Sequence, residues 1–226
     1  MHNIVDYLLI GNTRLHWAFN KNSSYEFSNT LVNDSLPKNI NFKKLIWASV
    51  GKYPTNNFLK KNQVTIKDIN LEKMPDFIGI DRALACFAAL SMFKSKLSKN
   101  LLIVDLGTTV SITKIDNQGK ILGGQLFPGF TTQLKSMEQS TKNLVFPNKL
   151  FIPNNKFEIS TMNAMLRGVY NSISGAINIA FDRKEDILIM CGGDANLIGN
   201  SLKKEIKDLI IEPNLVMYGM IFLNKK

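Results

Sequence analysis

Residues 105–109, Asp-Leu-Gly-Thr-Thr, combine groups that suit a polyphosphate ligand. They follow a strongly apolar run, residues 101–104, so we expect them at a strand-to-strand turn. Glycine lets the backbone approach a ligand, threonine hydroxyls donate hydrogen bonds to phosphate oxygens, and a carboxylate can hold a cation. The same residue types also suit an ordinary hairpin turn. This stretch alone therefore leaves a phosphate site and a plain turn both open.

Two further glycine-containing turns could do related chemistry. Gly11-Asn12-Thr13 offers backbone amides and a hydroxyl to a phosphate. Cys191-Gly192-Gly193-Asp194 passes from an apolar run into an expected helix, where glycines permit close approach of a flat ligand such as adenine and the helix dipole favours anions. The alternative for the second stretch is a tight turn in which Asp194 is simply the N-cap of that helix.

The motif Gly79-Ile80-Asp81-Arg82 predicts acid–base chemistry at the start of a helix. Asp81 could take a proton from a substrate hydroxyl, while Arg82 could pair with a carboxylate or phosphate. The alternative is that Asp81 only caps the helix. Arg82 argues against a purely structural motif, because a cation in the first helical turn opposes the helix dipole.

Alternating and buried apolar runs, broken by turn residues, predict the elements that must position these motifs. We expect strands at 5–10, 14–19, 25–27, 45–50, 64–66, 101–104, 110–115, 187–190 and 208–211, and a further strand leading into Gly123-Gly124. We expect helices at 54–62, 82–93, 131–141, 161–181, 195–204 and 215–222.

An internal repeat organises these elements. The segment around Gly11 aligns with the segment around Gly107 at an offset of 96 positions (107 − 11), and each copy reads strand, Gly-[Asn/Thr]-Thr turn, strand. We therefore predict a duplicated α/β fold with two lobes, residues 1–96 and 97–226, and a nucleotide cleft between them. The lysine-rich segment 94–100 marks the expected boundary.

Composition excludes several classes of protein. Of the 226 residues, 45% are hydrophobic and 20% charged, which indicates a globular chain. No apolar run is long enough to cross a bilayer, and the first residues lack the pattern of a signal peptide. Two distant cysteines and two histidines argue against a disulfide framework or a zinc site, so we expect a cytoplasmic protein. The net charge of +10 is scattered in lysine pairs without aromatic interleaving, which makes nucleic-acid binding a weak fit.

Taken in order, the motifs resemble those of type III pantothenate kinases. The chain carries Gly-x-Asp-Arg from Gly79, Val-Asp-x-Gly-Thr-Thr from Val104, Gly-Gly-x-x-x-Pro-Gly from Gly123, Ser160-Thr161 and Gly-Gly-Asp-Ala from Gly192. The resemblance implies a ribonuclease H-like, actin-like fold and a homodimer. It also implies phosphorylation of pantothenate by ATP, the first step of coenzyme A synthesis. Magnesium and a monovalent cation, potassium or ammonium, are the implied metal ions.

The resemblance assigns expected roles by position. Asp81 is the proton acceptor for the pantothenate hydroxyl, and Asp105 is the ligand of the monovalent cation. The expected pantothenate site comprises Gly79, Ile80, Asp81, Arg82 and Thr161. The expected ATP site comprises Gly11, Asn12, Thr13, Arg14, Gly107, Thr108, Gly192 and Gly193.

Three positions depart from the family pattern. Leu9 stands where the first turn usually has an aspartate, Thr113 where the second hairpin commonly has another, and Glu72 near the place of an expected aromatic residue. Leu9 keeps a second hypothesis open: a nucleotide-binding regulatory relative that does not catalyse transfer. A third hypothesis is a kinase for another small hydroxyl compound.

Overall fold

The computed structural model describes residues 5–22, 24–37, 40–51, 58–75, 78–93 and 98–224. The chain divides into two compact units. Unit 1 consists of Met1–Met92 together with Asn214–Lys226, and unit 2 consists of Phe93–Pro213. The C-terminal segment thus packs with unit 1, whereas the predicted lobes 1–96 and 97–226 assign it to the second half. The nucleotide cleft between the two lobes remains a prediction. The assignment of separate functional roles to the two lobes also remains a prediction.

Unit 1 contains a four-stranded sheet in the order β3-β2-β1-β4. Its strands are β1 (Tyr7–Ile10), β2 (Arg14–Lys21), β3 (Ser24–Leu31) and β4 (Ile46–Ser49). β1 pairs antiparallel with β2 and parallel with β4. Residues alternate between the two faces of such a sheet. One face carries a core cluster that includes Leu8, Leu15 and Trp17.

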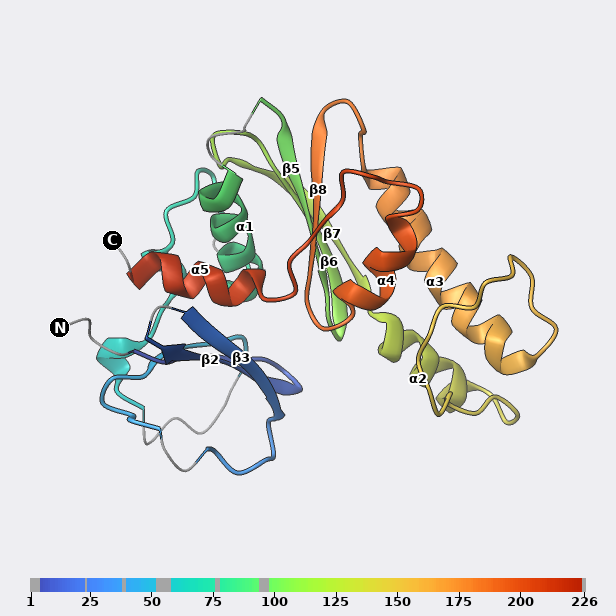
Figure 1. Ribbon diagram of the computed structural model, residues 1–226, viewed down its shortest axis with the longest axis horizontal. Helices are drawn as coiled ribbons and strands as arrows, with labels where there is room; N and C mark the ends of the chain where they lie inside the picture. Colours follow the sequence, from blue (N-terminus) through green and yellow to red (C-terminus); the bar gives the residue numbers. More distant parts are fainter. Residues whose placement is uncertain are drawn as a thin grey trace. The chain divides into compact units, whose positions relative to one another are not determined.

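Unit 1 also has two helices, α1 (Ile80–Phe93) and α5 (Leu215–Asn224); α5 packs against β1 and β2, and α1 lies beside α5 (Figure 1). Seven consecutive residues of α1, Ala83 to Ala89, are buried, and several are small, which permits close packing. Gly219 of α5 lies so close to the carbonyl oxygen of Leu84 that a Cβ there would collide with it. Tyr218 of α5 also packs edge-on against Phe27 of β3.

Unit 2 contains a five-stranded sheet in the order β7-β6-β5-β8-β9. Its strands are β5 (Asn100–Leu106), β6 (Thr109–Ile115), β7 (Ile121–Pro128), β8 (Asp186–Cys191) and β9 (Ile210–Ile211). Three helices, α2 (Phe130–Ser140), α3 (Thr161–Ala180) and α4 (Ala195–Leu202), contribute to one core cluster with β5, β6 and β8. They are the yellow-green, gold and orange-red helices beside the sheet in Figure 1.

The two sheets confirm the predicted duplication. In each unit a hairpin comes first, the third strand extends the sheet antiparallel, and the fourth strand pairs parallel with the first. The predicted offset of 96 holds for the first strands but not for the second ones. Three residues lie between β1 and β2, but only two between β5 and β6. Leu9 therefore pairs with His16, whereas Asp105 pairs with Ser111.

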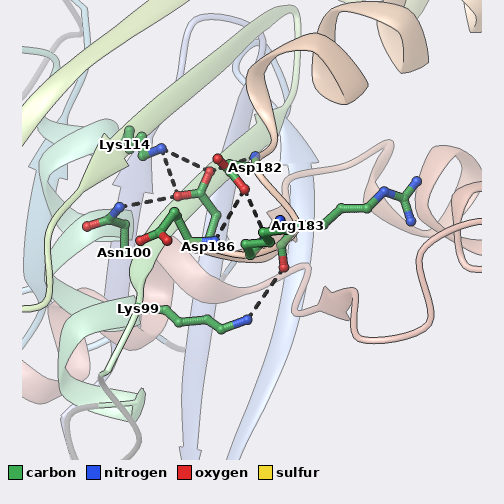
Figure 2. A network of polar contacts seen from close by, with 8 residues as sticks. Lys99, Asn100, Lys114, Asp182, Arg183 and Asp186 are labelled. Atoms are coloured by element: carbon green, nitrogen blue, oxygen red, sulfur yellow. Dashed lines mark hydrogen bonds and ion pairs between the residues drawn. The ribbon is translucent and has the colours of Figure 1, made fainter.

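A buried ion pair holds together the edge of the unit 2 sheet at which β5 and β8 begin (Figure 2). Lys114 of β6 lies 2.8 Å from a carboxylate oxygen of Asp186, and the Asp186 side chain is fully buried. Asn100 donates a further hydrogen bond to that carboxylate, at 3.4 Å. Asn100 and Asp186 are also register partners. These contacts therefore fix the alignment of β5, β6 and β8 at the end of the sheet that is far from Asp105.

Most predicted elements are present, with small differences at their ends. The predicted strand at 64–66 is wrong, because the residues that follow Thr65 form a short 3-10 helix, Ile66–Asp68. Only Lys60–Asn62 of the predicted helix at 54–62 is helical, again as a 3-10 turn, and residues 54–57 lie outside the described part of the chain. β3 is longer than predicted, and part of the predicted boundary, 94–97, is also outside the described residues.

Candidate functional site

The turn between β5 and β6 consists of Gly107 and Thr108. Asp105, one residue before the end of β5, is half-buried and lies between Ser111 of β6 and Cys191 of β8 in the sheet. Thr108 is exposed. A partly buried carboxylate next to an exposed hydroxyl is the arrangement that the sequence predicts for a phosphate and cation site.

Two predicted motifs of unit 2 meet at this turn, because the carboxyl ends of the parallel strands β5 and β8 share one edge of the sheet. Gly192, just after β8, has φ of +88°, a conformation that favours glycine. A Cβ on Gly192 would collide with a carboxylate oxygen of Asp105. The Asp194 amide donates to the Leu106 carbonyl at 3.0 Å. Asp105 therefore lies directly against the backbone of the Gly-Gly-Asp turn.

The start of α2 is fastened to the same turn. The Gly129 amide donates to the Thr108 carbonyl at 2.9 Å, and the Thr132 hydroxyl donates to the same oxygen at 2.7 Å. A Cβ on Gly129 would collide with the Gly107 carbonyl, which explains the glycine of the Pro-Gly motif. Thr132 is a residue that sequence reasoning missed, since a threonine within an amphipathic helix carries no distinctive signal.

In unit 1 the Gly11-Asn12-Thr13 turn connects β1 and β2. The Gly11 amide donates to the Arg14 carbonyl at 2.9 Å, and the Thr13 carbonyl accepts from the Val32 amide at 3.2 Å. Asn12, Thr13 and Arg14 are exposed. The backbone of the turn is thus tied down, while its three side chains lie at the surface.

The Gly79-Ile80-Asp81-Arg82 motif forms the first turn of α1, which begins at Ile80. Asp81 therefore lies inside the helix, and the alternative that it is the N-cap is wrong. Its Oδ1 accepts a hydrogen bond from the Arg82 amide at 2.8 Å. A Cβ on Gly79 would lie 2.6 Å from that same oxygen, so glycine leaves the carboxylate its space. Asp81 and Arg82 are both half-buried.

His16 is the residue of unit 1 that sequence reasoning missed. It points away from the core of Leu15 and Trp17, and its Nδ1 lies 2.6 Å from the Asn29 amide oxygen. Burial lowers the pKa of His16, and the hydrogen bond with Asn29 raises it. Arg14 adds a smaller lowering effect, and the charge of Asp81 a still smaller raising one. His16 thus lies near both the Gly11 turn and the start of α1. A single histidine two residues beyond a Gly-Asn-Thr-Arg turn was the available signal.

Thr161 lies apart from the other unit 2 motifs. It is the exposed first residue of α3, after the N-cap Ser160. Ser172 on the same helix donates to Gln133 in the first turns of α2, close to the Thr108 turn. Thr161 is eleven residues earlier, which corresponds to about 16 Å along the helix axis. The structure therefore brings Asp105, Gly107, Thr108 and Gly192 together, but not Thr161.

Within the described ranges, no three histidine, cysteine, aspartate or glutamate side chains gather into a preformed metal site. A nucleotide-bound magnesium ion does not need one, because it keeps several waters and binds the phosphates together with one or two carboxylates. Asp105 beside the phosphate-type turn fits that mode. None of the described helices is both long and apolar enough to span a membrane.

Comparison with known proteins identifies the family. The model of type III pantothenate kinases matches residues 55–183. A type III pantothenate kinase of Nostoc sp. is 30% identical over 94% of this chain and 91% of its own. The type III pantothenate kinase of Flavobacterium psychrophilum is 30% identical over 87% of this chain and 90% of its own. The family match begins after the Gly11 turn and ends before Gly192.

Solved structures support the fold. A Campylobacter jejuni protein assigned to the Baf family of transcriptional activators is similar over 98% of both chains, with a TM-score of 0.67 and 20% identity. The activator of 2-hydroxyisocaproyl-CoA dehydratase from Clostridium difficile, solved with ADPNP, is similar over 98% of this chain and 95% of its own, with a TM-score of 0.52 and 16% identity. Both comparisons support the duplicated actin-like fold. The family model and the two relatives that are 30% identical show that the chain belongs to the type III pantothenate kinase family.

Proposed function

We propose that this protein transfers the γ-phosphoryl group of ATP to the terminal hydroxyl of pantothenate, giving 4'-phosphopantothenate for coenzyme A synthesis. The observation that carries the proposal is the first turn of α1, which presents the Asp81 carboxylate beside Arg82 in a half-buried position. Family membership supplies the substrate. Phosphoryl transfer depends mainly on positioning and charge stabilisation, so few reacting side chains are needed.

Asp81 acts as the general base in this proposal. Its carboxylate takes the proton of the pantothenate hydroxyl as that oxygen bonds to the γ-phosphorus and the bond to the β-γ bridging oxygen breaks. The Arg82 guanidinium pairs with the pantothenate carboxylate. Gly79 and Ile80 line the same pocket, and Gly79 keeps room for the Asp81 oxygen.

The nucleotide roles fall on the two hairpin turns. Gly107 and Thr108, with Gly192 and Gly193, bind ATP, and Asp105 binds a monovalent cation, potassium or ammonium. The residues of the other turn that contribute to ATP binding are Gly11, Asn12, Thr13 and Arg14. Asp105, directly or through water, would also hold a magnesium ion, which would neutralise charge on the phosphates. The close approach of Asp105 to Gly192 supports this assignment, because it puts the carboxylate beside the glycine turn that is also assigned to ATP.

A homodimer is part of the proposal. Thr161 is about 16 Å along the axis of α3 from Ser172, the residue of that helix that contacts Gln133 near the Thr108 turn. It is flanked by exposed apolar side chains, Phe157, Ile159 and Met162. Apolar side chains grouped in this way are typical of surfaces that contact another protein. Thr161 is accordingly assigned to a pantothenate pocket shared with a second copy. A cytoplasmic location follows from the use of ATP and pantothenate.

The test is a coupled assay with ATP, magnesium and pantothenate, with and without potassium. Wild-type protein should release ADP only when pantothenate is present. Asp81→Asn should lower turnover by about 10²- to 10⁴-fold while nucleotide binding persists. Asp208→Asn, an exposed aspartate in unit 2, is the matched control and should keep full activity. A folded wild-type protein that forms no phosphopantothenate would refute the proposal.

One observation favours a second function, a nucleotide-binding protein without transfer. Leu9 is only 4% exposed and apolar, whereas its counterpart Asp105 is a half-buried carboxylate. This alternative predicts ATP binding without any pantothenate-dependent ADP release, even in Leu9→Asp. A kinase for another hydroxyl compound would instead show ADP release with a different member of a substrate panel.

A further inference from the structure

His16 occupies a defined place in the unit 1 sheet. It pairs with Leu9 of β1 on one side and with Asn29 of β3 on the other. Directly opposed residues in neighbouring strands point to the same face of a sheet. Leu9, His16 and Asn29 therefore form one row across three strands. The ring also lies beside the Gly11 turn, since a Cβ on Gly11 would be 3.4 Å from His16 Nε2.

The hydrogen bond to Asn29 sets the tautomer of His16. An amide oxygen only accepts, so the 2.6 Å contact requires the proton on Nδ1. Burial, the largest effect on this ring, lowers its pKa and favours the neutral form. Nε2 is then left with a lone pair. Among the described residues, no hydrogen-bond partner takes it up.

Two charges of opposite sign act on the ring, and that of Arg14 has the larger effect on its pKa. Arg14, on the same strand, disfavours the imidazolium, and Asp81, at the start of α1, favours it. Neither effect exceeds that of burial. Nε2 is therefore a neutral acceptor that lies near both the proposed phosphate turn and the proposed general base.

Unit 2 shows what occupies the corresponding place there. Asp105 and Ser111 are the register partners that correspond to Leu9 and His16. In unit 2 the group that can accept a hydrogen bond at this place is the Asp105 carboxylate, on the first strand of the hairpin. In unit 1 the first strand is apolar at this point, and the acceptor is the imidazole on the second strand.

We propose that His16 Nε2 accepts a hydrogen bond from an O–H group of a bound ligand at the first turn. The donor is either water on the divalent cation of the nucleotide or a hydroxyl of the acceptor substrate other than the one that gives its proton to Asp81. Both donors have the same chemistry, and both would be found where the Gly11 turn and Asp81 come near the ring. The inference rests on the proposed kinase function and names a further ligand-contacting residue of that site.

Nitrogen NMR tests the proposal directly, because the chain has only two histidines, His2 and His16. His16→Gln removes one set of imidazole signals and so assigns the other. In wild-type protein the unprotonated nitrogen of His16 should shift toward the range of hydrogen-bonded nitrogens when the donor ligand binds. His2 serves as an internal control and should not shift.

Two arms separate the two donors. Magnesium and ADP without pantothenate test the metal-bound water, and manganese in place of magnesium should then broaden the His16 signals. Pantothenate alone tests the substrate hydroxyl. A shift in either arm supports the proposal. Calorimetric binding of both ligands with an unchanged Nε2 signal would overturn it.

Kinetics of two variants provide a second readout. His16→Asn can keep a contact to Asn29 but removes the group at the Nε2 position, whereas Gln carries an amide oxygen that reaches it. We expect kcat/KM to fall about tenfold in His16→Asn, the loss typical of one hydrogen bond, and to recover largely in His16→Gln. Equal activity of His16→Asn and wild type would contradict the proposal. Absence of any kinase activity in wild type, with the NMR shift intact, would instead refute only the proposed function.

Discussion

The two hairpins, β1–β2 and β5–β6, have the same place in their sheets but carry different chemistry. Each begins its unit, and its first strand pairs parallel with the fourth strand of that sheet. The β5–β6 turn places a carboxylate, Asp105, against Gly192 at the end of β8. The β1–β2 turn is one residue longer and has Leu9 at the matching position. At the end of β4, it is the Asn12 side chain that approaches Gly51.

The difference shows how duplication separates scaffold from chemistry. Backbone pairing depends on strand order and tolerates almost any side chain, so both units keep it. A ligand site depends on particular polar side chains. Such a side chain can be placed on the first or the second strand of a hairpin without a change in the pairing of the sheet. Asp105 lies on the first strand of its hairpin, and His16 lies on the second strand of the other hairpin, opposite Leu9, which corresponds to Asp105. Both are half-buried ionisable groups next to a turn.

The largest expected effect tests the close contact in unit 2. Gly192→Ala should destabilise the protein by about 3 kcal/mol or more, because a Cβ there collides with Asp105 and the backbone at Leu106 and because φ is +88°. Chemical denaturation measures the loss. Gly193→Ala is the matched control, since a Cβ at Gly193 meets nothing within 4 Å. Equal stability of the two variants would show that the Asp105–Gly192 contact is absent in solution.

The second effect compares ion pairs of the two sheets. Asp186→Asn should cost about 3 kcal/mol, because it leaves Lys114 without its buried partner. Glu26→Gln in unit 1 removes a pair with Lys21 whose side chains are 61% and 64% exposed, and should cost at most about 0.5 kcal/mol. Urea titration of both variants gives the two values. Similar small losses would mean that the Asp186 carboxylate is solvated.

The smallest expected effect is on the pH dependence linked to His16. Burial lowers the pKa of His16 in the folded state, so the unfolded state binds more protons below about pH 6.5. Stability from this group is therefore complete above that pH and declines as the pH falls toward the folded pKa. Leu9→Asp adds a carboxylate opposite the ring, which should raise the His16 pKa and weaken that decline.

NMR titration of the imidazole and urea unfolding between pH 5 and pH 8, taken as roughly the range of histidine titration, measure both changes. Leu9→Asn is the control, because it introduces a polar group of similar size without charge. A His16 pKa that is the same in Leu9→Asp and Leu9→Asn would show that the two side chains are not neighbours, and would remove the basis for comparing the hairpins.

Local patterns were enough to predict much of the fold. The helices at α1, α2, α3, α4 and α5 and the paired hairpins were all predicted close to their observed bounds. Their signals are apolar periodicity and turn residues, which act over a few neighbours in the chain. The 3-10 segment at Ile66–Asp68 escaped prediction, because its Thr65–Asp68 capping box also suits other short turns.

Other features depend on contacts between distant residues. The packing of α5 with unit 1 depends on Gly219 against Leu84 and on Tyr218 against Phe27. No local pattern encodes such partners. The meeting of Asp105 with Gly192 likewise requires the parallel pairing of β5 and β8, whose first residues are 86 positions apart in the chain (186 − 100).

The sequence by itself determined the motif order, the duplicated hairpins and the family. These are properties of residue type and spacing along the chain. Only the tertiary structure decided that Asp81 lies inside the first turn of α1, that Asp105 touches Gly192, and that His16 pairs with Leu9. The physical reason is register: one extra residue in the first turn shifts which side chains face each other, and only strand pairing reveals that shift.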